Sequence, residues 1–262
     1  MRTDRLVLAA AGIALIWMPV ASTAPPDKHG HTDSSASWSY TGATGPEHWG
    51  DLDPQYAACK EGREQSPIDI EATQKAALPK LGFAYHSGPV RIINNAHTAV
   101  RVNYPRGNGN FLIVGDKRYE LTQFHFHRPS EEQVHGKAAE MVLHLMHTAS
   151  DGKVAAVAVL LQKGAANPTI ARLWQHMPPE PGEEQLLTGV EINPAGLLPQ
   201  GSAYYTYMGS LTAPPCTEGV QWFVLKDSAA ISTEQIGAFA KLYPHDVRPL
   251  QPVNGREVQE RE

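Results

Sequence analysis

The chain has 262 residues, of which 42% are hydrophobic and 19% are charged, and its formal net charge is −5. This length allows one large domain or two small ones, each with a sizeable core. The composition excludes a disordered or collagen-like chain, and the acidic balance argues against a nucleic-acid-binding protein. Beyond the first twenty-odd positions, no apolar run reaches the roughly 20 residues that a membrane-spanning helix needs.

The first 24 residues have the pattern of a secretory signal peptide. Two arginines precede an apolar stretch over residues 6–20, and small residues follow at positions 21–24, which is the order of a signal sequence. The alternative is an N-terminal membrane anchor. Residues 25–37 are polar and proline-rich, which indicates a flexible leader. We therefore expect an exported protein, periplasmic or secreted, with no membrane span after signal removal.

From residue 38 onward, no second linker and no internal repeat interrupt the chain, so a single domain is expected over residues 38–258, with a tail at 259–262. Short β-rich runs between turn signals predict strands at residues 90–93, 99–104, 111–114, 120–127, 141–147, 154–161, 204–208 and 220–225. Two helices are predicted, one at 170–176 after the N-cap Asn167 and Pro168, and one at 236–242 after a Ser232/Gln235 capping box. The residues thus predict a mainly β domain with a few short helices.

The chain has 2 cysteines, Cys59 and Cys216, which lie far apart in the sequence and outside any CxxC motif. In an oxidising compartment, an isolated pair of this kind most often forms one disulfide. Two free buried thiols are the alternative.

A metal-binding pattern lies on the predicted strand at 120–127. Gln123, His125 and His127 alternate with phenylalanines, so these three side chains share one face of the strand. His144, flanked by leucines on the strand at 141–147, supplies a third imidazole, whereas His147 faces the other way. Three imidazoles around an open position are typical of a catalytic zinc site; a hydrogen-bonded histidine cluster is the alternative.

Eight ordered segments give the chain a resemblance to the α-class carbonic anhydrases of the bacterial, exported type, from about residue 38 to 256. They are Gly45–Trp49, Gln65–Ile70, Asn94–His97, Gln123–His127, Ser130–Glu131, Leu143–His144, Leu211–Gly219 and Arg248–Pro252. The resemblance implies a single domain built on a large twisted, mostly antiparallel sheet with a few short peripheral helices.

The resemblance also implies a catalytic zinc ion, Zn²⁺, with His125, His127 and His144 matching its three ligands. Thr212 matches the residue that accepts a hydrogen bond from zinc-bound hydroxide, and Glu131 matches the carboxylate that takes the threonine proton. The implied activity is the reversible hydration of carbon dioxide to bicarbonate and a proton, by attack of zinc-bound hydroxide.

His97 matches the histidine that exports the proton, a role suited to a side chain that titrates near pH 6.5. Residues expected to support the ligands or the waters of the site are Tyr40, Asn95 and Gln123. Residues matching the substrate pocket are Met146, Ala156, Leu211, Thr212, Ala213 and Trp222. Cys59 and Cys216 match a disulfide of exported bacterial members, and such relatives are often homodimers.

Three positions depart from the family pattern. Val142 stands where the family commonly has a glutamate that accepts the other ring N–H of the third ligand, so another polar group, a water or Glu140 must take that place. Ala213 replaces a polar residue of the pocket. The segment after His97 is one residue longer than usual, which leaves open whether Ala99, Val100 or Arg101 lines the cleft.

Two other functions fit a protein of this kind. One is a zinc-site esterase or other hydrolase, and the other is a non-catalytic, carbonic-anhydrase-like binding module. The three histidines favour the enzyme, because a binding module would be expected to lose at least one ligand.

Overall fold

The computed structural model describes residues 37–97 and 100–262; the predicted signal peptide, and all of the leader except its last residue, lie outside this part. The strands are β1 (Asp69–Ile70), β2 (Gln74–Lys75), β3 (Leu81–Ala84), β4 (Gly88–Ile93), β5 (Arg101–Asn103), β6 (Phe111–Val114), β7 (Lys117–His127), β8 (Gln133–Val134), β9 (Lys137–Ala138), β10 (Met141–Ala149), β11 (Val154–Lys163), β12 (Gln185–Ile192), β13 (Tyr204–Ser210), β14 (Glu218–Leu225), β15 (Ala229–Ile231) and β16 (Gln259–Arg261). The α-helices are α1 (Trp49–Leu52), α2 (Ala58–Glu61), α3 (Pro168–Trp174) and α4 (Thr233–Ala240), and 3₁₀ turns lie at Gly42–Thr44, Pro54–Tyr56 and Pro194–Leu197.

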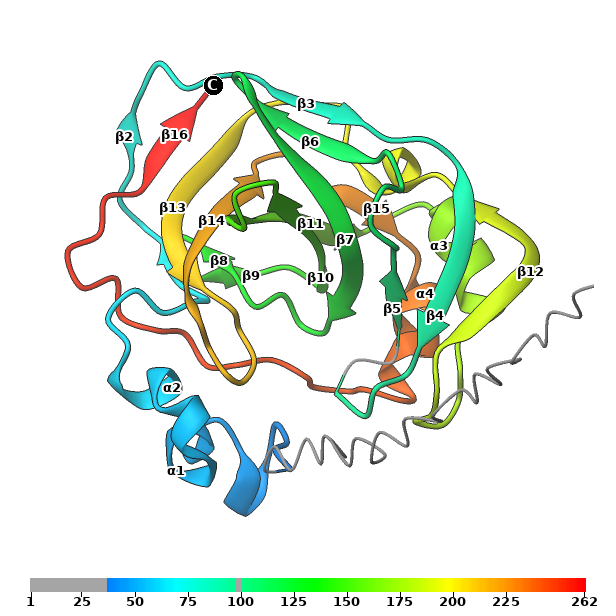
Figure 1. Cartoon of the computed structure of the whole chain (residues 1–262), viewed down its shortest axis with the longest axis horizontal. Coiled ribbons are helices and arrows are strands. Elements are labelled where there is room, and N and C mark those ends of the chain that lie inside the picture. The colour runs from blue at the N-terminus through cyan, green and yellow to red at the C-terminus, as the bar shows by residue number, and fades with distance from the viewer. Residues whose placement is uncertain (1–36, 98–99) are drawn as a thin grey trace, which may run out of the picture. The chain divides into compact units, whose positions relative to one another are not determined.

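One large twisted sheet dominates the fold (Figure 1). Its strands run in the order β12-β4-β5-β7-β10-β11-β14-β13-β16-β2, with β6 also paired to β7, β3 to β6 and β15 to β11. Most neighbours are antiparallel, and the parallel pairs are β11 with β14, β11 with β15 and β16 with β2. A small second sheet has the order β1-β8-β9. The expected large, mostly antiparallel sheet is confirmed.

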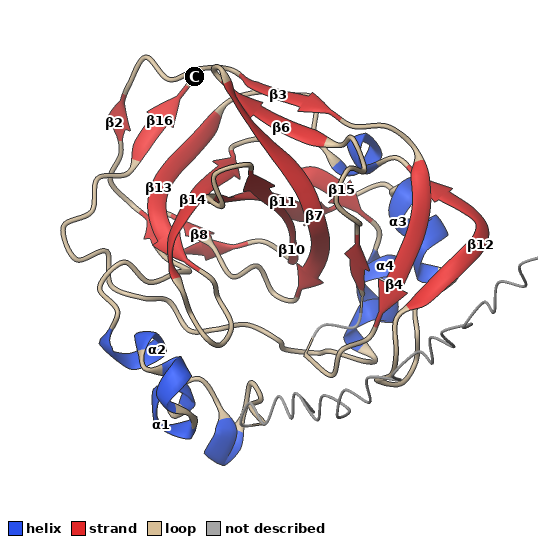
Figure 2. Cartoon of the chain, in the orientation of Figure 1, coloured by secondary structure: helices blue, strands red, loops and turns tan. Residues whose placement is uncertain are grey.

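The helices are short and lie at the periphery of the sheet (Figure 2). None of the helices within residues 37–97 and 100–262 has the length and apolar content that crossing a membrane requires. Both predicted helices are present. Asn167 caps α3 by accepting from two backbone N–H groups, and Ser232 and Gln235 form the predicted capping box of α4.

The strand pattern differs from the prediction at both ends of the sheet. β12, which was not predicted, pairs with β4 and has mostly exposed or half-buried side chains, so little of it carries a core-facing pattern. The last residues, expected as a tail, contain β16, which pairs with β13 and β2.

Side chains on the two faces of the sheet enter different clusters. On β7 and β10, Phe124, Phe126, Leu143 and Leu145 pack into the main core and are fully buried. Burial of each such side chain stabilises the fold by about 1.5–3 kcal/mol. Residues of the opposite face, such as Val142, join a second apolar cluster. The three histidines of the sequence pattern lie on this second face.

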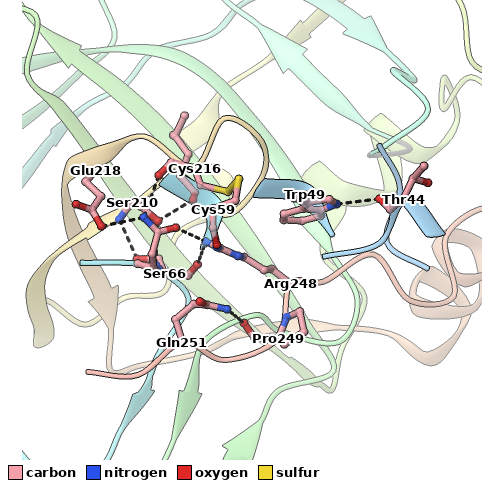
Figure 3. The surroundings of a disulfide bond; sticks show 12 residues. Thr44, Trp49, Cys59, Ser66, Ser210, Cys216, Glu218, Arg248, Pro249 and Gln251 are labelled. Atoms are coloured by element: carbon pink, nitrogen blue, oxygen red, sulfur yellow. Dashed lines mark hydrogen bonds between the residues drawn. A yellow bond between two sulfur atoms is a disulfide. The ribbon is translucent and has the colours of Figure 1, made fainter. Parts of the chain in front are cut away.

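Cys59 and Cys216 form a disulfide, which confirms the predicted pairing. It lies against Arg248, whose guanidinium is almost fully buried (Figure 3). The Nη2 group of Arg248 donates to the backbone carbonyl of Cys59 at 2.8 Å, and its backbone N–H donates to Oε1 of Glu131 at 2.8 Å. Cys216 follows Thr212 by four residues, so the disulfide ties the Thr212 segment to that of Cys59. Arg248 in turn ties the segment of Cys59 to the loop that carries Glu131.

We expect the double variant Cys59→Ser/Cys216→Ser to be less stable by up to about 5 kcal/mol on the chain-entropy description of a long closed loop. Denaturant unfolding followed by circular dichroism measures the loss. A reductant should lower the stability of the wild-type protein in the same way and leave the double variant unchanged. Two thiols reacting with a labelling reagent in the native, unreduced protein would contradict this pairing.

Candidate metal centre

The pairing of β7 with β10 brings three imidazoles to one point. His144 stands directly opposite His125 in the register of the two strands, and His127 lies two residues further along the same face of β7. One ligand atom from each ring lies within 4.8 Å of the other two. His127 and His144 are each 1% exposed, so the cluster lies at the inner end of the site.

Each ring has one nitrogen engaged by a different segment of the chain. The Nδ1–H of His125 donates to Oε1 of Gln123 at 2.8 Å, and that of His127 donates to the backbone carbonyl of Asp246 at 2.7 Å. The Nε2–H of His144 donates to both carboxylate oxygens of Glu132, at 3.1 Å each. These bonds leave Nε2 of the first two rings and Nδ1 of the third as the nitrogens available to a metal.

The electrostatics favour neutral imidazoles in the two ligands of β7. Burial lowers the pKa of His127 to about 3 and holds that of His125 well below its usual range, with further lowering from the neighbouring histidines. Burial also lowers the pKa of His144, but the nearby carboxylates of Glu132 and Glu131 outweigh it and raise this pKa. A metal binds the neutral form of imidazole.

The histidine cluster fits a metal ion. The Nε2 of His127 is buried and has no hydrogen-bond partner within the described residues, a costly arrangement unless another group uses the lone pair. Three imidazoles, each held by a hydrogen bond from its second nitrogen, form a donor set that suits zinc.

A cavity of about 260 Å³ opens onto the cluster. Its lining residues are Trp38, Tyr40, Asn95, His97, Arg101, Gln123, His125, His127, His144, Met146, Leu211, Thr212, Ala213, Pro214 and Trp222. Of the residues assigned to the site from sequence, Ala156 and Glu131 are buried behind this lining. Ala156 stands between Met146 and Trp222 in one cross-strand row.

Glu131 is a buried carboxylate with one free oxygen. Its Oε1 accepts the backbone N–H of Arg248, and its Oε2 has no hydrogen-bond partner in the part of the chain that is described. Burial raises the pKa of Glu131 to about 7, while His144 and Thr212 act in the opposite direction. Thr212 is itself 6% exposed and lines the cavity.

His97 lies on the cavity wall, where its ring stacks on Trp38 with 3.6 Å between ring centroids and 7° between ring planes. Its backbone N–H donates to Oδ1 of Asn95 at 3.1 Å. Burial lowers the pKa of His97 from its usual value of 6.5. The hydroxyl of Tyr40 is buried without a hydrogen-bond partner among the described residues, and burial raises its pKa.

Sequence reasoning left several residues of the site unassigned. Arg101 is the member of the longer segment that lines the cavity; Val100 is fully buried, and Ala99 lies outside the described residues. Glu132 was also missed, although its position directly after Glu131 was a usable signal. Asp246 contributes a backbone carbonyl, for which the residue type gives no signal.

The other histidine of β10 is separated from the cluster. A register irregularity falls between Met146 and His147, and the His147 side chain is buried on the opposite face. Its Nε2 accepts from the hydroxyl of Tyr85 at 2.6 Å, since its Nδ1 faces the carbonyl of Ala155 at 3.4 Å.

Comparisons with known proteins agree on one family. The family described as eukaryotic-type carbonic anhydrase matches residues 44–262. A carbonic anhydrase of Klebsiella pneumoniae is 40% identical over 251 residues, which cover 95% of this chain and 96% of that protein. One from Pectobacterium atrosepticum is 41% identical over 226 residues, covering 86% of this chain and 91% of that protein. The solved α-carbonic anhydrase of Thermovibrio ammonificans, in complex with the inhibitor sulfanilamide, has a TM-score of 0.81 and 43% identity, covering 86% of this chain and 99% of that one.

We expect His144→Ala to abolish most metal binding, because two imidazoles hold a divalent ion far more weakly than three. His147→Ala, the matched control from the same strand, should lose stability but retain the metal. Mass spectrometry of the metal content after dialysis measures both. An equal loss of metal from the two variants would contradict the assignment of the strand faces.

Proposed function

The chain belongs to the eukaryotic-type, or α, carbonic anhydrase family, and we propose that it catalyses the reversible hydration of carbon dioxide at a zinc ion held by His125, His127 and His144. The observation that carries the proposal is the convergence of these three imidazoles, each with one nitrogen free, at the inner end of a cavity. In carbonic anhydrases as a class, zinc when bound lowers the pKa of a coordinated water to about 7, which supplies a nucleophile near neutral pH.

Thr212 and Glu131 are suited to orient the reacting oxygen. Oε1 of Glu131 is already occupied by the Arg248 backbone, so Oε2 is the oxygen available to accept the proton of the Thr212 hydroxyl. The threonine oxygen can then only accept from a group in the cavity. Because the Thr212 hydroxyl donates to Glu131, it accepts a hydrogen bond from the group in the cavity. The site therefore selects a ligand that has a hydrogen to donate.

One part of the cavity wall is apolar. Leu211, Met146 and Trp222 line it, and the Trp222 indole N–H is turned away to donate to the carbonyl of Ser210 at 2.9 Å. Such a surface holds no ordered water tightly and suits an uncharged gas. Ala213 offers no hydroxyl, so bicarbonate receives one polar contact fewer there and is released more readily.

Proton export is assigned to His97, with Asn95 and Tyr40 holding the waters between it and the metal. The imidazole can accept a proton from this water chain and pass it to buffer, and its stacking on Trp38 holds the ring on the cavity wall. The lowered pKa of His97 favours the neutral, accepting form.

We also propose that the protein acts outside the cytoplasm, in the periplasm or in the surrounding medium. The signal-peptide pattern of residues 1–24 and the Cys59–Cys216 disulfide support this location, because disulfides persist in oxidising compartments.

The decisive experiment combines metal analysis with stopped-flow hydration of carbon dioxide. The purified protein should contain about one zinc ion per chain, lose hydration activity when a chelator removes the metal, and regain it when zinc is restored. Bound zinc without hydration would favour a non-catalytic binding module. Ester hydrolysis that greatly exceeds hydration would favour a hydrolase.

His97→Ala should lower kcat at low buffer concentration by at least about tenfold, while kcat/KM for carbon dioxide stays nearly unchanged. The reason is that kcat/KM reports steps that precede proton export. Imidazole-type buffers should restore kcat, because they carry the proton in place of the side chain. Thr212→Ala, the contrasting variant, should lower kcat/KM itself and resist this rescue.

The pH profile of the same reaction gives the sign of the His97 shift. A lowered pKa keeps the ring neutral to more acidic pH, so the buffer-independent part of kcat should rise with a midpoint below 6.5. The midpoint should disappear in His97→Ala. A profile that is identical in the two proteins would assign proton export to another group.

A further inference from the structure

The acceptor of the His144 ring proton comes from an unexpected part of the chain. On β10 itself, the position two residues before His144 and on the same face is occupied by Val142, which packs in the second apolar cluster. Glu140, the nearest acid of the strand's N-terminal side, is exposed to solvent. The acceptor is instead Glu132, from the loop that precedes β8.

Glu132 is built into a fixed position. Its side chain is fully buried, its backbone carbonyl accepts from the Ser130 hydroxyl at 2.8 Å, and the next residue, Gln133, begins the pairing of β8 with β1. A carboxylate that has lost all contact with water is costly to bury unless it is paired. The acceptance of one ring N–H by both of its oxygens is therefore a specific interaction and no chance contact.

The three candidate ligands are not held alike. Gln123 and the backbone carbonyl of Asp246 accept from His125 and His127, whereas the acceptor for His144 is a side-chain carboxylate. Hydrogen bonds with an ionised partner are roughly twice as strong as neutral ones. His144 is also the one ring of the three in which Nδ1 would be the nitrogen left to hold a metal, so its tautomer must be opposite to that of the other two.

We propose that Glu132 is a positioning residue that fixes the orientation and tautomer of His144 for zinc binding, in place of a carboxylate at position 142. This inference rests on the proposed zinc site. It predicts that the carboxylate is required near the Nε2 of His144 but can be supplied from either position, since side chains two apart on a strand project from the same face.

The test measures zinc affinity and release by competition with a chelator, on the full protein. Glu132→Ala should bind zinc about 10- to 100-fold more weakly and release it correspondingly faster. Glu132→Gln keeps a neutral acceptor, so its zinc binding should weaken by only about 10-fold, the smaller loss of that range. Glu140→Gln, the matched control, removes an exposed acid of the same region and should match the wild-type protein.

A rescue experiment that moves the carboxylate from position 132 to position 142 is the more specific test. Adding Val142→Glu to Glu132→Ala should recover at least about tenfold of the lost affinity, because position 142 lies two residues from His144 on the same face of β10. A residue with only a structural role would not be replaced in this way. The melting temperature of the metal-free protein gives a second readout: the zinc-induced rise should shrink in Glu132→Gln, with little change in the metal-free value.

Unchanged zinc affinity and release in both Glu132 variants would overturn the inference, as would a fall in metal-free stability with zinc affinity intact. If Glu132→Ala does not fold, the zinc release rate of Glu132→Gln decides. A wild-type protein that binds zinc without hydrating carbon dioxide would contradict the proposed function while leaving this inference to stand on the affinities. A wild-type protein without zinc affinity would overturn both.

Discussion

The register between β7 and β10 is the constraint on which the site depends. Side chains alternate between the two faces of a strand, so a slip of one residue would turn His144 into the core and bring a leucine to the metal position. The opposing face prevents that slip, because Phe124 and Phe126 of β7 and the leucines beside His144 are fully buried there. The register irregularity in the pairing of β10 with β7 lies between Met146 and His147, beyond His144, and therefore leaves the pairing of His144 with His125 intact.

The second nitrogen of each of the three imidazoles carries a proton and needs a hydrogen-bond acceptor. Buried polar groups need partners, and two of the three partners lie outside β7 and β10, whereas Gln123 belongs to β7 itself. Asp246 accepts from His127, Glu132 accepts from His144, and the residue next to Glu132 is held by the backbone of Arg248. The same arginine binds the carbonyl of Cys59. The loop with Glu131 and Glu132, the C-terminal segment and the disulfide thus form a continuous support behind the metal site.

The cavity combines two surfaces with different tasks. Leu211, Met146 and Trp222 give the lining apolar surface, and Gln123, Arg101 and His97 give it polar atoms. Arg101 pairs with His125 across β5 and β7, and its Nε donates to Asn103 at 2.9 Å. Burial lowers the pKa of this arginine, opposed by the nearby carboxylate of Glu184. The structure thus places a guanidinium on the cavity wall, at a position where the family resemblance left three residues open.

The sequence by itself determined what depends on short-range pattern. The alternation around His125 set the face of each side chain, the caps of α3 and α4 set where those helices begin, and the ordered motifs identified the family and the residues to examine. Each of these signals is contained within a few consecutive residues. Over so short a distance, the backbone geometry of a helix or strand relates a residue's position in the sequence to the direction of its side chain.

Only the tertiary structure decided which distant groups complete the site. The partner of His144 is a loop carboxylate because the chain folds that loop beneath β10, and Val142 gave no indication of where the replacement would come from. The backbone carbonyl of Asp246 could not be read from a residue type, since every residue has one. Arg101, rather than Val100, lines the cavity because β5 pairs with β7 in one particular register. Such choices depend on strand pairing or on contacts between separate segments, 12 residues apart for Glu132 and His144 and 119 for His127 and Asp246, which local pattern does not encode.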